Sequence, residues 1–300
     1  MPGSRTLDVQ SLAHKLLARW YADHARQLPW REAGVSGWEV LVSEVMLQRT
    51  PVSRVLPVYA AWRRRWPTPT ALAADQPGEA VRQWGRMGYP RRALRLHQAA
   101  TLVDRLHDGE VPSTYDDLRA LPGVGDYTAA AVRAFAYRQP AVVLDTNVRR
   151  VLGRLVGGNE SPSPTVTNAE RARAIDLLPH QPEAAAQGSV ALMELGALVC
   201  TARSPACAKC PVKRLCAWRA ANYPAYAGPP RRGQRYAGTD RQCRGRILAL
   251  LRGQDGPVSV GRVDAVWPDP RPALQPWPSL RVALPPRPAV RRGARTCGCP

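Results

Sequence analysis

Four cysteines lie within seventeen residues of one another, in the pattern Cys200-x6-Cys207-x2-Cys210-x5-Cys216. Four thiolates on a short segment can bind one zinc ion tetrahedrally or ligate a [4Fe–4S] cluster. Structural zinc usually takes two separated pairs of close ligands, whereas only Cys207 and Cys210 form a close pair here. The spacing therefore favours one [4Fe–4S] cluster per chain, with zinc as the alternative.

Glu44 is an acidic residue in an otherwise apolar segment, 40–47, whose apolar residues recur at helical spacing. Burial disfavours the charged form of a carboxyl, so we expect a raised pKa and a proton retained near neutral pH. Gln48 follows on the same helical face, so both side chains can point into one pocket. The pattern predicts a general acid, and a carboxylate on a helix surface is the alternative.

A glycine-containing turn, Leu121-Pro-Gly123-Val-Gly125, separates two predicted helices at 116–120 and 127–136. Its glycines allow a tight turn that leaves N–H groups free at the start of the second helix, where a phosphate oxygen can bind. The net charge of +20 and the isoelectric point near 10.7 also indicate an acidic partner, although a generally basic surface is the alternative. Together these features predict binding to double-stranded DNA.

The location of the protein follows from its apolar and cysteine patterns. No apolar run approaches the length of a membrane span, and residues 1–9 lack the apolar stretch of a signal peptide. The clustered cysteines indicate a metal site in a reducing compartment rather than a disulfide framework. We therefore expect a cytoplasmic, nucleoid-associated protein without a membrane partner.

Helical periodicity dominates the chain, and the predicted fold class is all-α. Besides the helices above, segments 93–106, 148–155, 169–178 and 188–199 are predicted to be helical, and the one extended candidate, 141–144, is too short to found a sheet. Residues 223–240 are typical of a linker, 241–267 of a small helical remnant with a weak winged-helix-like pattern, and 268–300 of a Pro/Arg-rich disordered tail.

Three features follow one another along the chain: the hairpin, Asp145 in Val-Leu-Asp-Thr-Asn147-Val-Arg-Arg, and the cysteine segment. Over about residues 7–220 the chain resembles the helix–hairpin–helix glycosylase superfamily. Four motifs look like its adenine DNA glycosylase branch: Ser43-Glu-Val-Met-Leu-Gln-Arg-Thr50, Met193-Glu-Leu-Gly-Ala-Leu-Val-Cys-Thr201, Leu28-Pro-Trp-Arg31 and Gly88-Tyr89.

The resemblance implies two helical subdomains with the DNA and active-site cleft between them. In this arrangement residues 1–28 form an N-terminal helix that packs on the cluster subdomain, 29–140 a six-helix barrel with the helix–hairpin–helix, and 141–222 the cluster subdomain. The implied function is base excision repair by a monomer that removes adenine mispaired with 8-oxoguanine or guanine and leaves an abasic site.

The resemblance also implies catalytic roles. Breaking an N-glycosidic bond requires a proton for the leaving base and stabilisation of a cationic sugar. Glu44 would protonate adenine at N7, while Asp145 would stabilise the sugar cation or its covalent adduct and Asn147 would orient Asp145 or the sugar. From the residues alone, Asp145 is also a good helix N-cap. Tyr127 stands where strand-cutting relatives carry a Schiff-base lysine, so a monofunctional enzyme is expected.

Extruding the target base from DNA requires a wedge and a pocket. By resemblance, the wedge candidates are Tyr89 and the pair Gln48–Arg49, with ordinary core packing as the alternative for Tyr89. The pocket candidates are Trp30, Arg31 and Glu194, with a plain surface charge as the alternative for Glu194.

Three residues depart from the family pattern. Arg49 replaces a glutamine, Thr146 replaces a glycine beside Asp145, and Pro90 stands where a second tyrosine is common. Because mismatch thymine glycosylases of the superfamily often carry arginine near the first position, a thymine/uracil mismatch glycosylase is the second prediction. A non-catalytic DNA-binding iron–sulfur protein is the third.

Overall fold

The computed structural model describes residues 3–179, 181–228, 236–254 and 256–267. All regular structure in these ranges is helical, which confirms the predicted all-α class, and segment 141–145 is an irregular connection rather than a strand. None of the described helices is long and apolar enough to span a bilayer. The predicted tail, 268–300, lies outside the described residues, as does part of the predicted linker.

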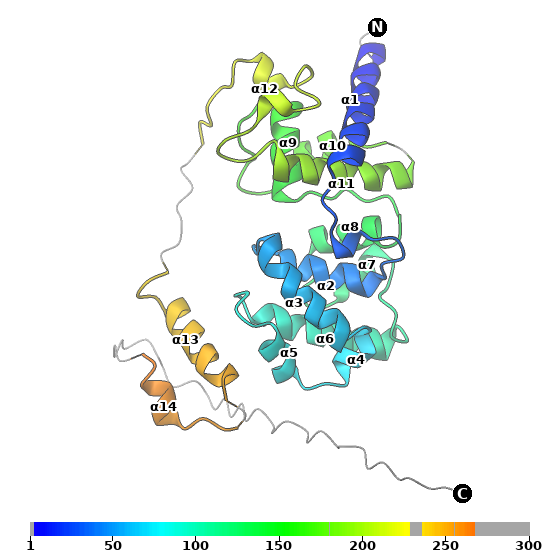
Figure 1. Cartoon of the computed structure of the whole chain (residues 1–300). Coiled ribbons are helices and arrows are strands. Elements are labelled where there is room, and N and C mark those ends of the chain that lie inside the picture. The colour runs from blue at the N-terminus through cyan, green and yellow to red at the C-terminus, as the bar shows by residue number, and fades with distance from the viewer. Residues whose placement is uncertain (1–2, 180, 229–235, 255, 268–300) are drawn as a thin grey trace, which may run out of the picture. The chain divides into compact units, whose positions relative to one another are not determined.

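The chain divides into two units, Met1–Pro230 and Arg231–Pro300. The helices of the first unit are α1 (Gly3–His24), η1 (Pro29–Arg31), α2 (Gly37–Leu47), α3 (Val52–Arg65), α4 (Pro69–Ala73), α5 (Pro77–Gln83), α6 (Arg91–Leu106), α7 (Tyr115–Ala120), α8 (Asp126–Phe135), α9 (Thr146–Leu155), α10 (Asn168–Leu177), α11 (Pro182–Leu198), η2 (Cys207–Lys209) and α12 (Ala217–Ala220) (Figure 1).

One hydrophobic core of the first unit belongs to helices α2–α8. It runs from Leu28 to Val132 in the sequence, and its largest fully buried side chains include Trp62 and Trp84. Helix α2 begins with a capping box in which the Ser36 side chain and the Glu39 carboxyl each bind the other's backbone N–H. This cap fixes the start of the helix that carries Glu44.

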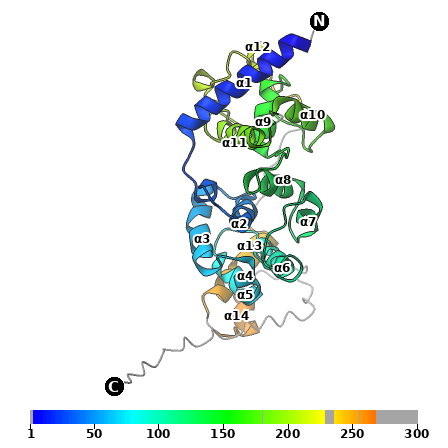
Figure 2. The ribbon, with the colours of Figure 1, turned by 90° about the vertical axis from the view of Figure 1, so that its right-hand side faces the viewer.

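A second hydrophobic core belongs to α1 and α9–α11, and α1 packs against α11 and α10. Figures 1 and 2 both show these helices grouped together, apart from α2–α7. Helix α11 begins six residues before the predicted start, because Pro182 occupies its first turn, where proline needs no hydrogen bond.

Small side chains join the two groups of helices. Ala130, Ala131 and Ala134 of α8 form a third cluster with Val143 and with Ala186 of α11. Alanine allows close approach of helices, so α8 lies against both α2 and α11. Helix α8, the 141–145 connection and α11 therefore meet at one junction, and the candidate site is formed by residues of these elements and of α2.

The second unit contains α13 (Asp240–Arg252) and α14 (Val260–Asp264). Helix α13 begins one residue before the predicted remnant, 241–267, and α14 lies within it. The Arg246 guanidinium of α13 lies over the Trp267 ring, 5.1 Å from its centroid, and so links α13 to the residues that follow α14.

Candidate active site

Glu44 lies on α2 with only 4% of its surface exposed, which confirms the predicted burial. Burial is the main cause that raises the pKa of Glu44 to about 7. A hydrogen bond from the Tyr127 hydroxyl opposes this rise, the nearby Asp145 charge adds to it, and the Arg31 charge opposes it. At neutral pH the carboxyl is therefore divided between its protonated and ionised forms, as a general acid requires.

Asp145 is the N-cap of α9, which confirms the capping prediction. Its Oδ1 accepts a hydrogen bond from the Val148 N–H at 2.6 Å, and its Oδ2 accepts one from the Asn147 amide at 2.9 Å. Burial raises the pKa of Asp145, and these hydrogen bonds and the Arg150 charge oppose the rise. The carboxylate is thus held in one orientation beside Glu44, close enough to influence the pKa of Glu44.

Glu194 on α11 is fully buried, so the alternative of a plain surface charge is wrong. Its Oε1 accepts hydrogen bonds from the Arg26 backbone N–H and Nε, and its Oε2 accepts from Arg26 Nη2 and from Arg31 Nη2 at 3.0 Å. Burial alone raises the pKa of Glu194, but the two guanidiniums outweigh it and bring the pKa down to about 2. Glu194 is therefore an anion that anchors Arg31 beside Glu44.

Trp30 belongs to η1 and is buried, with its ring edge-on to Tyr59 at 5.1 Å between centroids. An open hollow of about 610 Å³ lies next to this segment; its lining residues are Arg26, Gln27, Leu28, Val52, Ser53 and Leu56. The volume is within the range of small-molecule pockets. The lining of this hollow includes Arg26, which pairs with Glu194, but none of the predicted pocket residues, and Trp30 packs into the core.

The hairpin needs only one of its two glycines for backbone geometry. Gly123 has φ +86°, and a Cβ there would meet the Arg95 side chain at 3.1 Å. Gly125 is the N-cap of α8 with φ −99°, a conformation open to any residue, so the expectation that both glycines make the tight turn is wrong for Gly125. Nothing lies within 4 Å of a Cβ built at Gly125, so this backbone faces open space where a phosphate can approach.

The predicted wedge segments both contain a residue in the left-handed region. Arg49, just after α2, has φ 57°, and Tyr89 has φ 48°. Side chains other than glycine rarely adopt this conformation, and such positions gather at functional sites. Tyr89 is 39% exposed, so the alternative that it is an ordinary core residue is wrong.

The four cysteines lie between α11 and α12 and influence one another. The pKa of Cys210 is raised to about 11, mainly by burial and in part by the charges of Cys200, Cys216 and Cys207. Arg154, which is 1% exposed, donates from Nη1 to Cys200 Sγ at 3.4 Å. Within the described ranges no three His, Cys, Asp or Glu side chains converge on the position of a metal ion. Four mutually interacting thiols with a buried guanidinium at one sulfur fit the donor set of an iron–sulfur cluster.

The cysteine segment is also connected to Asp145. The Arg150 guanidinium donates from Nε to the Cys200 carbonyl at 2.7 Å and from Nη2 to the Asn147 amide oxygen at 2.8 Å. A Cβ at Gly196 would lie 2.7 Å from the Cβ of Asn147, so only glycine allows this close approach of α11 to α9. A short path of hydrogen bonds therefore links a cysteine backbone to the residue that orients Asp145.

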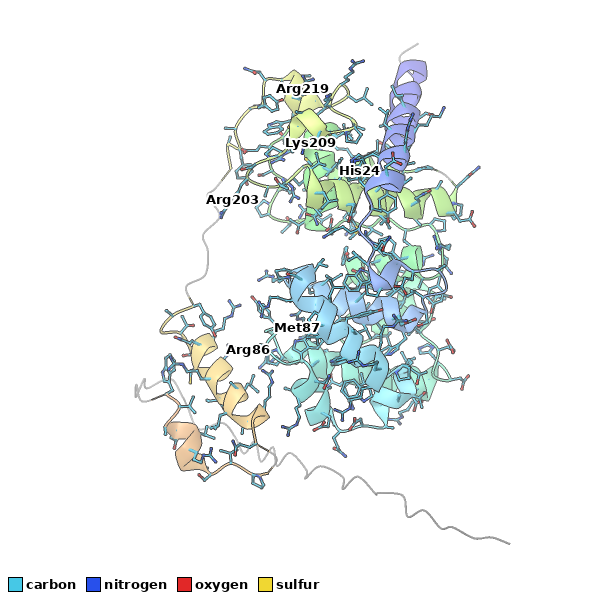
Figure 3. All side chains as sticks on the ribbon, in the orientation of Figure 1. His24, Arg86, Met87, Arg203, Lys209 and Arg219 are labelled. Carbon is cyan, nitrogen blue, oxygen red and sulfur yellow. The ribbon has the colours of Figure 1, made fainter. Side chains whose placement is uncertain are left out.

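The surface around the cysteines is basic. Arg203 and Lys209 of the cysteine segment and Arg219 of α12 are exposed, and Figure 3 labels all three in this part of the molecule. Such side chains suit the phosphates of DNA.

Sequence analysis missed three arginines of this region, the half-buried Arg26 and the buried Arg150 and Arg154. Arg150 carried a readable signal, because it follows Asn147 by three residues on one helical face. Arg26 and Arg154 have their partners far away in the sequence, and no local spacing identifies them.

Comparisons with known proteins agree with this class of fold and site. Residues 42–176 match the HhH-GPD superfamily of base excision DNA repair proteins, and residues 200–216 match the iron–sulfur binding domain of endonuclease III. A thermostable thymine-DNA glycosylase structure has a TM-score of 0.63 at 24% identity, over 71% of this chain and 98% of that one. A non-covalent endonuclease III–DNA complex gives 0.60 at 24% identity, over 71% and 97%. These structures share the fold.

The sequence comparison is more specific. The adenine DNA glycosylase of Mycobacterium tuberculosis (strain ATCC 25618 / H37Rv) is 53% identical over 251 residues, which are 84% of this chain and 82% of that protein. The chain belongs to the adenine DNA glycosylase family of base excision repair enzymes, and the predictions of family, enzyme class and DNA as partner are confirmed. The predicted [4Fe–4S] cluster is confirmed by the match at residues 200–216, which begins at Cys200 and ends at Cys216.

Proposed function

We propose that this enzyme excises adenine mispaired with 8-oxoguanine or guanine, acts as a monomer, and leaves an abasic site without cutting the strand. A cytoplasmic, nucleoid-associated location is part of the same proposal. The observation that carries it is the grouping of Glu44, Tyr127 and Asp145, one half-protonated acid and one fixed carboxylate with a phenol beside them.

Glu44 supplies the proton for the departing base. Adenine is a poor leaving group unless one of its ring nitrogens is protonated, and a general acid is most effective when its pKa is near the working pH. The pKa of Glu44, about 7, meets this condition. Its burial also excludes water, so the proton is available to a base in the pocket rather than to solvent.

Asp145 stabilises the positive charge that develops on the sugar. Two hydrogen bonds at 2.6 and 2.9 Å fix both of its oxygens, so the carboxylate does not reorganise during the reaction. Separate environments therefore give two neighbouring carboxyls two roles, an acid and a charge stabiliser.

The monofunctional part of the proposal rests on Tyr127 and on the placement of lysines. Burial and the charges of Glu44 and Asp145 raise the pKa of Tyr127 well above its usual value, so the phenol stays neutral and hydrogen-bonded to Glu44. The three lysines of the chain are Lys15, Lys209 and Lys213, on α1 and in the cysteine segment. Borohydride trapping on a mispaired duplex should give no strong protein–DNA adduct; an efficient adduct would contradict this part of the proposal.

A [4Fe–4S] cluster, when bound by Cys200, Cys207, Cys210 and Cys216, ties together the two ends of the basic cysteine segment. Every step of the excision itself is assigned to the residues of the Glu44–Asp145 site.

The experiment that tests the substrate uses four duplexes with A:8-oxoguanine, A:G, T:G and U:G pairs under single-turnover conditions, with Glu44→Gln as the control. Excision of adenine from the first two, abolished in the control, supports the proposal. Excision of only thymine or uracil would favour the second candidate, a mismatch thymine/uracil glycosylase. Arg49 is the one observation that favours that candidate, since it departs from the adenine-family pattern.

A further inference from the structure

Arg92 on α6 is a buried arginine outside the Glu44–Asp145 site. Its Nη1 donates hydrogen bonds to the carbonyl oxygens of Val45, Met46 and Gln48, at 2.9, 3.0 and 2.6 Å. These carbonyls are at the C-terminal end of α2, which leaves its last carbonyls without partners inside the helix. The Arg92 guanidinium thus caps α2 with a positive charge at the negative end of the helix dipole.

The same guanidinium also holds the turn between α5 and α6. Its Nη2 donates to the Gly88 carbonyl at 3.2 Å, and to the Thr50 hydroxyl at 2.9 Å just beyond α2. Its central carbon lies 5.1 Å from the Trp84 ring centroid and 5.6 Å from that of Tyr89. One side chain therefore contacts both segments at once.

The two segments that Arg92 joins are the predicted wedge segments, Gln48–Arg49 and Tyr89. Each contains a residue with φ in the left-handed region, 57° for Arg49 and 48° for Tyr89. A strained conformation persists only where its surroundings fix it. Arg92 holds the carbonyl just before each of these residues, that of Gln48 before Arg49 and that of Gly88 before Tyr89.

Helix α6 also contacts the hairpin that is predicted to bind a phosphate. Arg95, one turn after Arg92, packs its side chain against the space in front of Gly123 in the hairpin. A buried charge is costly to keep, and burial lowers the pKa of Arg92 to about 10. An apolar residue in its place would leave the carbonyl oxygens at the end of α2 and at Gly88 without this donor, so the cost of the buried charge is offset by the contacts that the guanidinium makes to both segments.

We propose that Arg92 is a positioning residue that locks the two wedge segments together, so that opening of the mispaired duplex and extrusion of the target base depend on it. The inference rests on the proposed function and on the predicted wedge role of Gln48–Arg49 and Tyr89. Arg92 does not touch the reacting atoms; it acts through the segments it holds.

The test separates duplex opening from chemistry. The full-length enzyme and the variants Arg92→Met and Arg92→Lys act on the same adenine in two contexts, an A:G mispair and a short unpaired bubble where little opening is needed. Arg92→Met should lower the single-turnover rate about tenfold or more on the mispair and less than about threefold on the bubble. Arg92→Lys keeps the charge but loses the forked contacts, and should show a smaller loss in the same direction.

A second readout follows extrusion directly, with 2-aminopurine at the target position. Its fluorescence rise should be slowed in Arg92→Met while duplex affinity stays near that of the parent. Arg105→Met is the matched control, because it removes an exposed arginine from the far end of the same helix. Its rates should equal those of the parent in both contexts.

Two outcomes would overturn the inference. An equal loss of single-turnover rate on the mispair and on the bubble would mean that Arg92 supports only the fold. No loss of rate on either would mean that the wedge segments keep their conformation without Arg92. If Arg92→Met does not fold, Arg92→Lys and Thr50→Val replace it in the same assays. Thr50→Val removes one hydrogen-bond acceptor of the guanidinium. If the parent excises another base, the same pair of contexts is used with that base, so a wrong substrate proposal is distinguished from a wrong role for Arg92.

Discussion

Replacing Glu44 with glutamine should make the protein more stable at alkaline pH while it abolishes excision. The unfolded chain ionises this carboxyl above pH 4.5, whereas the folded chain keeps its proton up to about pH 7. Between these values unfolding releases a proton, so stability falls as the pH rises. The contribution of the protonated carboxyl is fully present below pH 4.5 and fully lost above pH 7.

The size of the effect follows from the pKa. A rise from 4.5 to about 7, at about 1.4 kcal/mol for each pH unit, corresponds to about 3 kcal/mol above pH 7. At pH 5 the same calculation gives less than about 1 kcal/mol. Glutamine has nearly the same shape and no proton to lose. The free energy of unfolding of Glu44→Gln, relative to that of the parent, should therefore rise by about 2–3 kcal/mol when the pH is raised from 5 to 8.5.

The measurement is thermal unfolding of both proteins at pH 5 and pH 8.5, at one scan rate. For a unit of this size, each kcal/mol of stability moves the melting temperature by about 2–4 °C. The melting temperature of Glu44→Gln minus that of the parent should therefore be roughly 5–10 °C larger at pH 8.5 than at pH 5. Glu110→Gln is the matched control, since Glu110 is exposed and the same substitution should leave the pH dependence unchanged.

The reasoning is refuted if the difference between parent and Glu44→Gln is the same at both pH values. That result would mean that Glu44 ionises like a solvated carboxyl. It would also remove the argument that Glu44 holds the proton for the base, whatever the variant does to activity.

Three further predictions concern the same site. Tyr127→Phe removes the hydrogen bond that lowers the pKa of Glu44, so the alkaline limb of the single-turnover pH–rate profile should move to higher pH; a shift to lower pH would contradict the assigned direction. Asn147→Leu frees one oxygen of Asp145 and should slow excision about 10–100-fold with duplex affinity nearly unchanged, measured by single-turnover rate and binding titration. Cys200→Ser should lower the iron content and the DNA affinity, and a fully active variant without iron would show that the cluster is dispensable.

The fold was predictable because its signals are local. Apolar spacing and Pro/Gly punctuation located α6, α8, α9 and α10 to within two residues, whereas α11 begins six residues before its predicted start and α3, α4 and α5 were not predicted. Asp145 was readable as an N-cap from its neighbours alone. The cysteine pattern was equally local. The division into subdomains at 28, 140 and 222 stays a prediction, although the two hydrophobic cores separate near the first two of these positions.

The parts that sequence analysis missed depend on contacts between distant residues. Arg92 reaches carbonyls 44 to 47 residues away, and Arg26 reaches Glu194 across 168 residues. A guanidinium that binds backbone carbonyls has no complementary residue type to find in the sequence. The left-handed conformations of Arg49 and Tyr89 are also invisible there, because neither is a glycine or asparagine.

The different pKa values of Glu44 and Glu194 follow from contacts that only the structure shows. Both are buried carboxyls on largely apolar helices, and the sequence around them gives no sign of how they differ. Glu194 faces two guanidiniums and has a pKa of about 2, whereas Glu44 receives a phenol hydrogen bond and has a pKa of about 7. Only the second can give up a proton near neutral pH. Arg31 links the two, because its hydrogen bond to Glu194 fixes it and leaves only its charge to act on Glu44. Glu194 thus holds the Arg31 guanidinium in an ion pair of its own, whereas direct pairing of Arg31 with Glu44 would lower the pKa of Glu44 further.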